Sequence, residues 1–143
     1  MRPTFHYRLA RRIHVAVHGA ERPSDEEWTA YLDDIGARLP QIDGLYVVTP
    51  GGDLSNDQRR RSVEFWRHAE RQPRIAVVTS SRLVVRVSGA LRWFMPSQIK
   101  TFLPAQTDAA FAYLALDEPQ RRAVLRAVEE LGQLAAGRAA PSP

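Results

Sequence analysis

Apolar residues recur along this chain with two different periods, and the two periods alternate. Short runs in which nearly every residue, or every second residue, is apolar are typical of β-strands, whereas apolar residues three and four positions apart are typical of helices. The strand pattern occurs four times, within residues 8–19, 44–49, 74–79 and 98–103. The helical pattern fills the stretches between and after them, so the chain is predicted to alternate strands with helices.

Two of the predicted helices have explicit start signals. In each, a serine precedes the periodic apolar stretch and a glutamate or glutamine follows three positions later: Ser24 with Glu27, and Ser55 with Gln58. This is the capping-box pattern, in which side chain and backbone bond reciprocally at the first turn. We expect the first helix over residues 24–39, ended by Pro40, and the second from Ser55 to about residue 71.

The later part of the chain is less uniform. Residues 80–95 fit either a β-hairpin or a helix with one apolar face, and the spacing favours the helix. A short helix is expected to be capped by Thr107, and a last helix to start near residue 117, where acids and a proline stand in the first turn. Residues 137–143 are expected to form a flexible tail.

Strands that alternate with helices predict a single α/β domain over residues 1–136. Its sheet is expected to be largely parallel, with four strands or slightly more, helices packed on it and an extra helix at the C-terminal end. The pattern leaves the pairing and direction of the first strand open. Because polar residues alternate with the apolar ones in 8–19, we expect this strand to be less deeply covered than the others.

Composition and motifs remove several classes of protein. The 143 residues include no cysteine, which excludes a disulfide framework, thiol catalysis and cysteine-ligated zinc. No apolar run approaches the ~18 residues that span a bilayer, and the N-terminus lacks an apolar stretch of signal-peptide length, so a cytoplasmic protein is expected. The chain carries neither a nucleophile elbow nor a phosphate loop. We therefore expect no enzyme activity and no cofactor.

Neither the histidines nor the paired acids suggest a catalytic or metal centre. His14 and His18 stand about 13 Å apart on one strand, too far to share a metal ion directly, so no metal site is expected. Asp33 and Asp34 are neighbours on a predicted helix and point in different directions. We interpret them as solvated surface residues rather than an acid–base pair.

Charge is strongly segregated along the chain. The net charge is +4, but residues 21–58 sum to −7 and residues 59–104 to +8, and nineteen of the twenty basic residues are arginine. Arginine is well suited to bidentate contacts with carboxylate or phosphate. The segregation indicates either a basic surface for a partner or complementarity between an acidic and a basic helix.

Besides the order of the elements, four segments follow one another in a recognisable way: 74–79 (RIAVVT), the long amphipathic segment up to Phe94, 99–102 (IKTF) and 108–114 (DAAFAYL). In these features the chain resembles, over about residues 10–116, the SpoIIAA-like branch of the STAS superfamily. This resemblance implies a non-enzymatic module, either a phospho-switched antagonist of an anti-sigma factor or a small-molecule or lipid-binding protein. In STAS antagonists the regulatory serine follows a buried strand at the start of a helix, which corresponds to Ser55 here; Leu54 and Asn56 depart from the usual motif.

Ser55 thus has two compatible interpretations. As the first residue of the capping box it stabilises a helix start. As a phosphorylation site it would place negative charge at a helix N-terminus, near Arg59.

Two further groups of residues are candidate binding surfaces. A protein partner is expected on a helix surface over 55–71 and 82–95, where basic and aromatic side chains gather: Arg59, Arg60, Arg61, Arg67, Arg82, Arg86 and Trp93. A lipid or a small anionic ligand is the alternative, at the edge where parallel strands end: Gly51, Gly52, Asp53, Ser80, Ser81 and Arg82. Nucleic acid on the arginine-rich helix is favoured less, and a homo-oligomer stays open.

Overall fold

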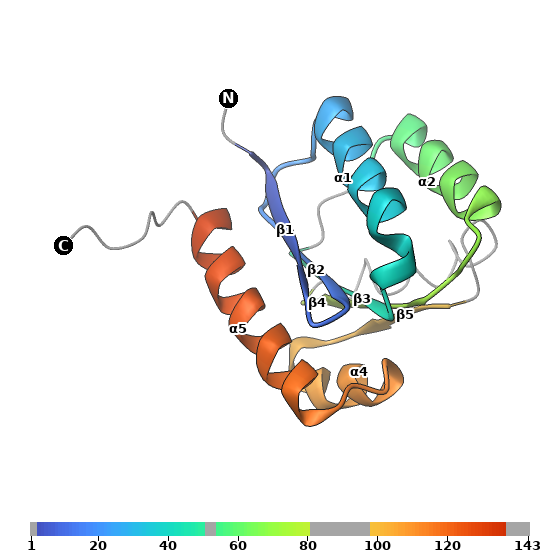
Figure 1. Ribbon diagram of the computed structural model, residues 1–143. Helices are drawn as coiled ribbons and strands as arrows, with labels where there is room; N and C mark the ends of the chain where they lie inside the picture. The colour runs from blue at the N-terminus through green and yellow to red at the C-terminus, as the bar shows by residue number, and fades with distance from the viewer. Residues whose placement is uncertain (1–2, 51–53, 81–97, 137–143) are drawn as a thin grey trace.

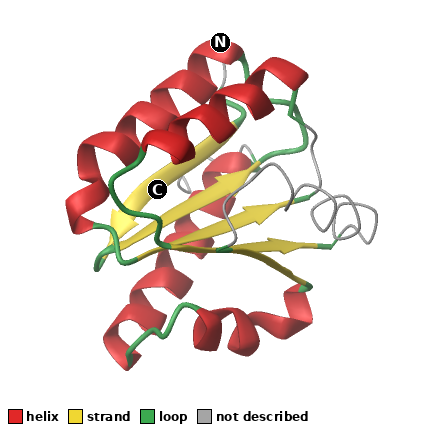
Figure 2. Ribbon diagram, turned by 90° about the vertical axis from the view of Figure 1, so that its right-hand side faces the viewer, coloured by secondary structure: helices red, strands yellow, loops and turns green. Residues whose placement is uncertain are grey.

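The computed structural model describes residues 3–50, 54–80 and 98–136, which form one sheet with helices on both faces (Figure 2). The strands are β1 (Phe5–Ala10), β2 (Ile13–His18), β3 (Gly44–Thr49), β4 (Arg74–Thr79) and β5 (Ile99–Phe102). The helices are α1 (Asp25–Arg38), α2 (Asn56–His68), α4 (Thr107–Tyr113) and α5 (Glu118–Ala135), with short 3₁₀ turns at Leu39–Gln41 and Pro104–Gln106.

The sheet follows the order of the chain, β1-β2-β3-β4-β5. β1 is antiparallel to β2, and every later pair is parallel. Helices α1 and α2 cover one face of the sheet, and α4 and α5 cover the other (Figures 1 and 2). The predicted α/β domain with a largely parallel sheet and an added C-terminal helix is confirmed.

The first predicted strand is in fact a hairpin of two strands. β1 and β2 are joined through Arg11 and Arg12, whose φ angles are 46° and 70°. A two-residue hairpin turn with positive φ at both central residues normally carries Asn or Gly. Because two arginines stand there instead, no residue marks the turn, and the prediction of one strand over 8–19 was wrong.

The expectation that this strand is the least covered was also wrong. Residues 13–17 of β2 are all buried, because β1 extends the sheet beyond β2 and helices cover both faces. Ile13, Val15 and Val17 pack in the cluster beneath α4 and α5, while Ala16 packs beneath α1. An alternating strand can be buried when a polar side chain bonds to the helix that covers it, as Nε2 of His14 does to Asp34 of α1; Nδ1 of His14 has no partner among the described residues.

Both predicted capping boxes are present at the starts of α1 and α2. α2 ends at His68 rather than near residue 71. Thr107 does not cap α4: it is the first helical residue, and its hydroxyl donates instead to the carbonyl of Pro104 at 2.8 Å. The choice between helix and hairpin for 80–95 falls almost entirely, and the predicted tail 137–143 wholly, outside the described residues.

The hairpin turn yields a stability prediction. A left-handed backbone costs an ordinary residue ~1–2 kcal/mol, and asparagine tolerates it better. Arg11→Asn should therefore raise the free energy of unfolding by about 0.5–1 kcal/mol, measured by urea denaturation. Arg12→Asn is the matched control: it relieves the same strain but loses two bonds to Asp43, at 2.9 and 3.1 Å, and should gain less. A lower free energy of unfolding for Arg11→Asn would show that the backbone at Arg11 is not strained.

Candidate functional site

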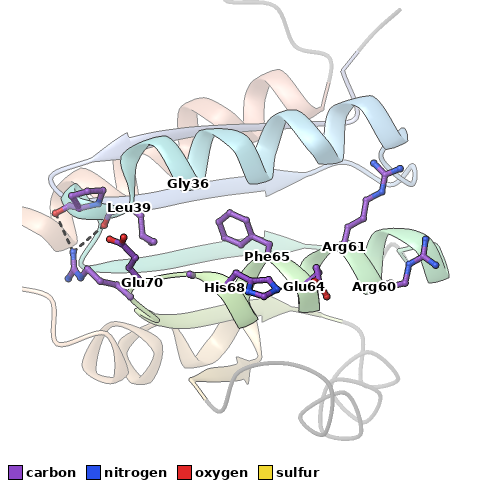
Figure 3. A pocket seen from close by; sticks show the side chains of 11 residues that line it. Gly36, Leu39, Arg60, Arg61, Glu64, Phe65, His68 and Glu70 are labelled. Carbon is purple, nitrogen blue, oxygen red and sulfur yellow. Dashed lines mark hydrogen bonds and ion pairs between the residues drawn. The ribbon is translucent and has the colours of Figure 1, made fainter.

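A long groove runs between α1 and α2 on the outer face of the molecule (Figure 3). Its volume is about 880 Å³, within the range of ligand-binding and docking sites. The floor is apolar and the walls carry both signs of charge. The lining residues are Gly36, Leu39, Pro40, Arg60, Arg61, Glu64, Phe65, His68, Ala69, Glu70 and Arg71.

The floor of the groove depends on a glycine in the last turn of α1. A Cβ atom at Gly36 would lie 3.3 Å from Cε1 of Phe65, tighter than an ordinary contact. The absence of a side chain at Gly36 therefore lets the Phe65 ring approach the backbone of α1, at the cost of ~1 kcal/mol in helix propensity. Phe65 in turn packs edge-on against the buried Trp66, with ring centroids 5.0 Å apart.

Polar contacts fix the two helices at both ends of the groove. At their N-terminal ends, Gln58 donates to the carbonyl of Pro23 at 2.7 Å, and the Trp28 indole donates to the Ser62 hydroxyl at 2.9 Å. Further along, Arg61 donates to the hydroxyl of Thr29 at 2.8 Å. At the other end, Arg71 donates to the carbonyls of Leu39 and Pro40, at 3.1 and 3.2 Å. These hydrogen bonds hold α1 and α2 in fixed positions and so determine the shape of the groove.

Most charges along α2 are paired within that helix. Asp57 accepts from Arg60 and from Arg61, the latter at 2.9 Å, and Glu64 pairs with Arg67 and His68 at 3.8 and 3.0 Å. These side chains are substantially exposed, and such pairs contribute at most ~1 kcal/mol. A partner can therefore exchange them for its own contacts at little cost.

Only some of the described residues of the predicted partner surface line the groove. Arg60 and Arg61 line the groove, whereas Arg67 is exposed beside it and Arg59 is half-buried. Arg82, Arg86 and Trp93 lie outside the described residues. The apolar floor could not be predicted, because the contact between Gly36 and Phe65 joins two helices and no spacing pattern along the sequence reveals it.

Ser55 is the N-cap of α2, as predicted. Its hydroxyl accepts from the Gln58 backbone at 3.0 Å, and the Gln58 side chain accepts from the Ser55 backbone at 3.1 Å. Gln58 is buried, and its side-chain amide also donates to the carbonyl of Pro23, just before α1, and to Asp25, the first residue of α1. The start of α2 is therefore coupled to the start of α1, and a charge added at Ser55 would act next to this junction.

The carboxyl ends of β2, β3 and β4 meet in a second hollow, of about 620 Å³, between the sheet and α4 and α5. Thr49, Thr79 and Ser80 contribute hydroxyls there, and most of the remaining lining is apolar. Of the predicted ligand edge only Ser80 is described; Gly51, Gly52, Asp53, Ser81 and Arg82 lie outside the described residues. A third, smaller cavity of about 170 Å³ lies between the sheet and helices α1 and α2.

His14 is a buried polar group that the sequence analysis misjudged. Its ring is fully buried and its Nε2 lies 2.8 Å from Oδ2 of Asp34, whose other oxygen accepts from Arg38 at 3.0 Å. Burial lowers the pKa of His14, so the neutral ring donates to Asp34. Partial burial acts to raise the pKa of Asp34, but the bonds from His14 and Arg38 outweigh it and the pKa is lowered. Asp34 is thus a structural partner, not the purely solvated residue that we expected.

Among the described residues, no helix is long and apolar enough to cross a membrane, and no three His, Cys, Asp or Glu side chains are placed to hold a metal ion. A family model described as SpoIIAA-like matches residues 12–115. The chain therefore belongs to the SpoIIAA-like family, which indicates a regulatory module of the anti-sigma-factor-antagonist type. No curated protein and no solved structure matches the chain.

Two histidines, the half-buried His18 and the buried His14, predict how stability depends on pH. His18 stacks on Phe5, with ring centroids 4.5 Å apart, and burial lowers its pKa to about 4. Between pH 7 and pH 5 the unfolded chain takes up a proton at His18 and the folded chain does not, so stability falls as pH falls. The loss should be about 2 kcal/mol for His18 alone, since each pH unit below the ordinary value of ~6.5 costs ~1.4 kcal/mol.

Urea denaturation at pH 7 and pH 5 measures this loss. His18→Phe keeps a ring against Phe5 and removes the titrating group, so it should lose markedly less stability than the natural chain over the same interval. His14 acts in the same direction and should account for part of what remains. An identical pH dependence in both proteins would show that His18 is not the source.

Proposed function

We propose that the chain is a non-enzymatic regulatory module that binds a protein partner along the groove between α1 and α2. The observation that carries the proposal is the groove itself, in which an apolar floor formed by Phe65 and Leu39 lies between arginines and glutamates. A buried apolar centre with a polar, exchangeable rim is the usual organisation of protein–protein interfaces. Membership of the SpoIIAA-like family supports a regulatory partner.

The charges favour a protein over a nucleic acid. Both Arg60 and Arg61 are paired with Asp57, and Glu64 and Glu70 stand in the same groove. A phosphate backbone would meet these carboxylates and be repelled, whereas a protein helix with mixed charges can pair with both signs.

Charge reversal within the groove tests the proposal. Arg60→Glu should weaken partner binding about tenfold, which corresponds to ~1.4 kcal/mol, measured by titration with the purified partner. Arg122→Glu on α5 is the matched control: its side chain is 78% exposed against 79% for Arg60, and it too is paired along its own helix. Equal weakening by both variants, or by neither, would place the partner elsewhere.

Ser55 supports a switch at the same site. Phosphate there would add about −1.5 to −2 charge at the N-terminus of α2, one turn from Arg59. The exposed end of the groove carries Arg60, so the added charge would change the surface that a partner meets.

Two substitutions separate the structural and regulatory roles of Ser55. Ser55→Ala removes the cap and should cost about 1 kcal/mol in unfolding free energy, whereas Ser55→Asp keeps a capping oxygen and should cost little. If Ser55 is a switch, only the Asp variant changes partner affinity beyond that stability effect. Equal affinities for the Asp variant and the natural chain would contradict the switch, while mass spectrometry of the protein from its own cells detects the phosphate directly.

A second candidate is a carrier of a small molecule or lipid. It is favoured by the cavity of about 170 Å³ beneath α1 and α2, whose lining is mainly apolar, including Leu32, Val47 and Ile75. That volume is below the ~300–1,000 Å³ of most ligand sites, so we place this function second. Native mass spectrometry of freshly purified protein distinguishes the two, because a carrier would retain a stoichiometric ligand.

A further inference from the structure

The outer edge of β1 carries backbone groups that point away from the sheet. The backbone N–H of Gly19 donates to the carbonyl of Thr4 at 2.7 Å, which fixes the phase of the ladder between β1 and β2. In an antiparallel pair, alternate residues bond to the partner strand and those between them face outward. Phe5, Tyr7 and Leu9 therefore direct their N–H and C=O groups to the open side of β1.

Within the part of the chain that the structure describes, no hydrogen bond uses these outward groups. Figure 1 shows β1 as the edge of the sheet nearest the viewer, between α1 and α5. β1 pairs with β2 in an unbroken register over all its residues, and it contains no proline. It thus lacks the bulges and prolines with which proteins usually protect an edge strand.

We propose that this edge pairs with β1 of a second copy of the chain, antiparallel, about a two-fold axis at Tyr7. In that register Tyr7 faces Tyr7 of the second copy, and Phe5 faces Leu9 of the second copy. Every outward N–H and C=O of the three residues then finds a partner. The edge is self-complementary, which is the condition for a two-fold interface.

Helix α5 supports a second copy rather than an unrelated strand. α5 packs over both β1 and β2, and Arg8 of β1 is paired with Glu130. Leu134 lies one turn beyond Glu130 on the same flank and is 46% exposed. Neighbouring strands lie ~4.8 Å apart, and each α5 packs over β1 and β2 of its own chain. When the two β1 strands pair, the two α5 helices on either side of that pair are separated by about two strand spacings, or about 10 Å, which is an ordinary helix-packing distance. The exposed Leu134 would then be covered.

This surface is separate from the groove. β1 and α5 both lie outside residues 12–115, the part that the SpoIIAA-like family model matches, and the groove lies on the α2 side of α1. Pairing through β1 would thus join two modules while leaving both grooves open, so that one dimer presents two partner sites.

Two exposed leucines of α5 provide a matched test. Leu125 is 53% exposed and lies nine residues before Leu134, which corresponds to a net rotation of about 180° around the helix axis. Leu125 therefore lies on the opposite flank of α5. Size-exclusion chromatography with light scattering should give the mass of two 16.1 kDa chains for the natural protein and for Leu125→Arg. Leu134→Arg should give the mass of one chain. A single-chain mass for the natural protein at high concentration, or equal behaviour of the two variants, would overturn the proposal.

The register is tested by crosslinking, which is unambiguous because the chain has no cysteine. Paired residues that bond across an antiparallel seam have Cα atoms ~5.5 Å apart, within the range of a disulfide. Tyr7→Cys should therefore form a dimeric disulfide on mild oxidation, whereas Arg11→Cys at the turn should not. If the Tyr7→Cys variant keeps its circular dichroism spectrum and its dimeric mass but forms no disulfide, this register is excluded. The comparison of the two leucine variants tests dimer formation and does not depend on the register.

Discussion

The burial of β2 on both faces is the constraint on which the rest of this fold depends. Its apolar positions pack beneath α4 and α5, and its other positions must be covered by α1 although one of them is a histidine. The bond from Nε2 of His14 to Asp34 gives that histidine one partner and joins α1 to the sheet, while its Nδ1 is buried without a partner among the described residues. β1 then shields the flank of β2 that would otherwise be an edge. A single buried strand thus determines where one helix and one further strand must lie.

The position of α1 in turn determines the groove. α2 follows β3 on the same face and packs against α1 through the bond between Trp28 and Ser62 and through Phe65 at Gly36. The two helices are joined at their N-terminal ends, where the Gln58 side chain bonds to Pro23, and the groove runs between them. Because the capping serine of α2 lies at this junction, the residue that starts α2 also lies beside the contacts that join α2 to α1.

The sequence predicted what is local and missed what is tertiary. Ser24, Glu27, Ser55 and Gln58 follow a pattern with a direct physical cause, so both helix starts and the alternating fold were correctly predicted. The hairpin was missed because tertiary contacts, such as the bonds from Arg12 to Asp43, hold an unfavourable dipeptide in its turn. The partner of His14 and the floor at Gly36 join residues twenty or more positions apart, and no spacing rule in one sequence shows such contacts.

Site-specific photocrosslinking in cells can show whether a protein partner occupies the groove between α1 and α2. A photoreactive amino acid at position 68 lies in the groove, and one at position 108 lies on α4, on the opposite face of the sheet. With a partner in the groove, a single crosslinked protein is expected from position 68 and none from position 108. Crosslinking from position 108 with none from position 68 would contradict this expectation.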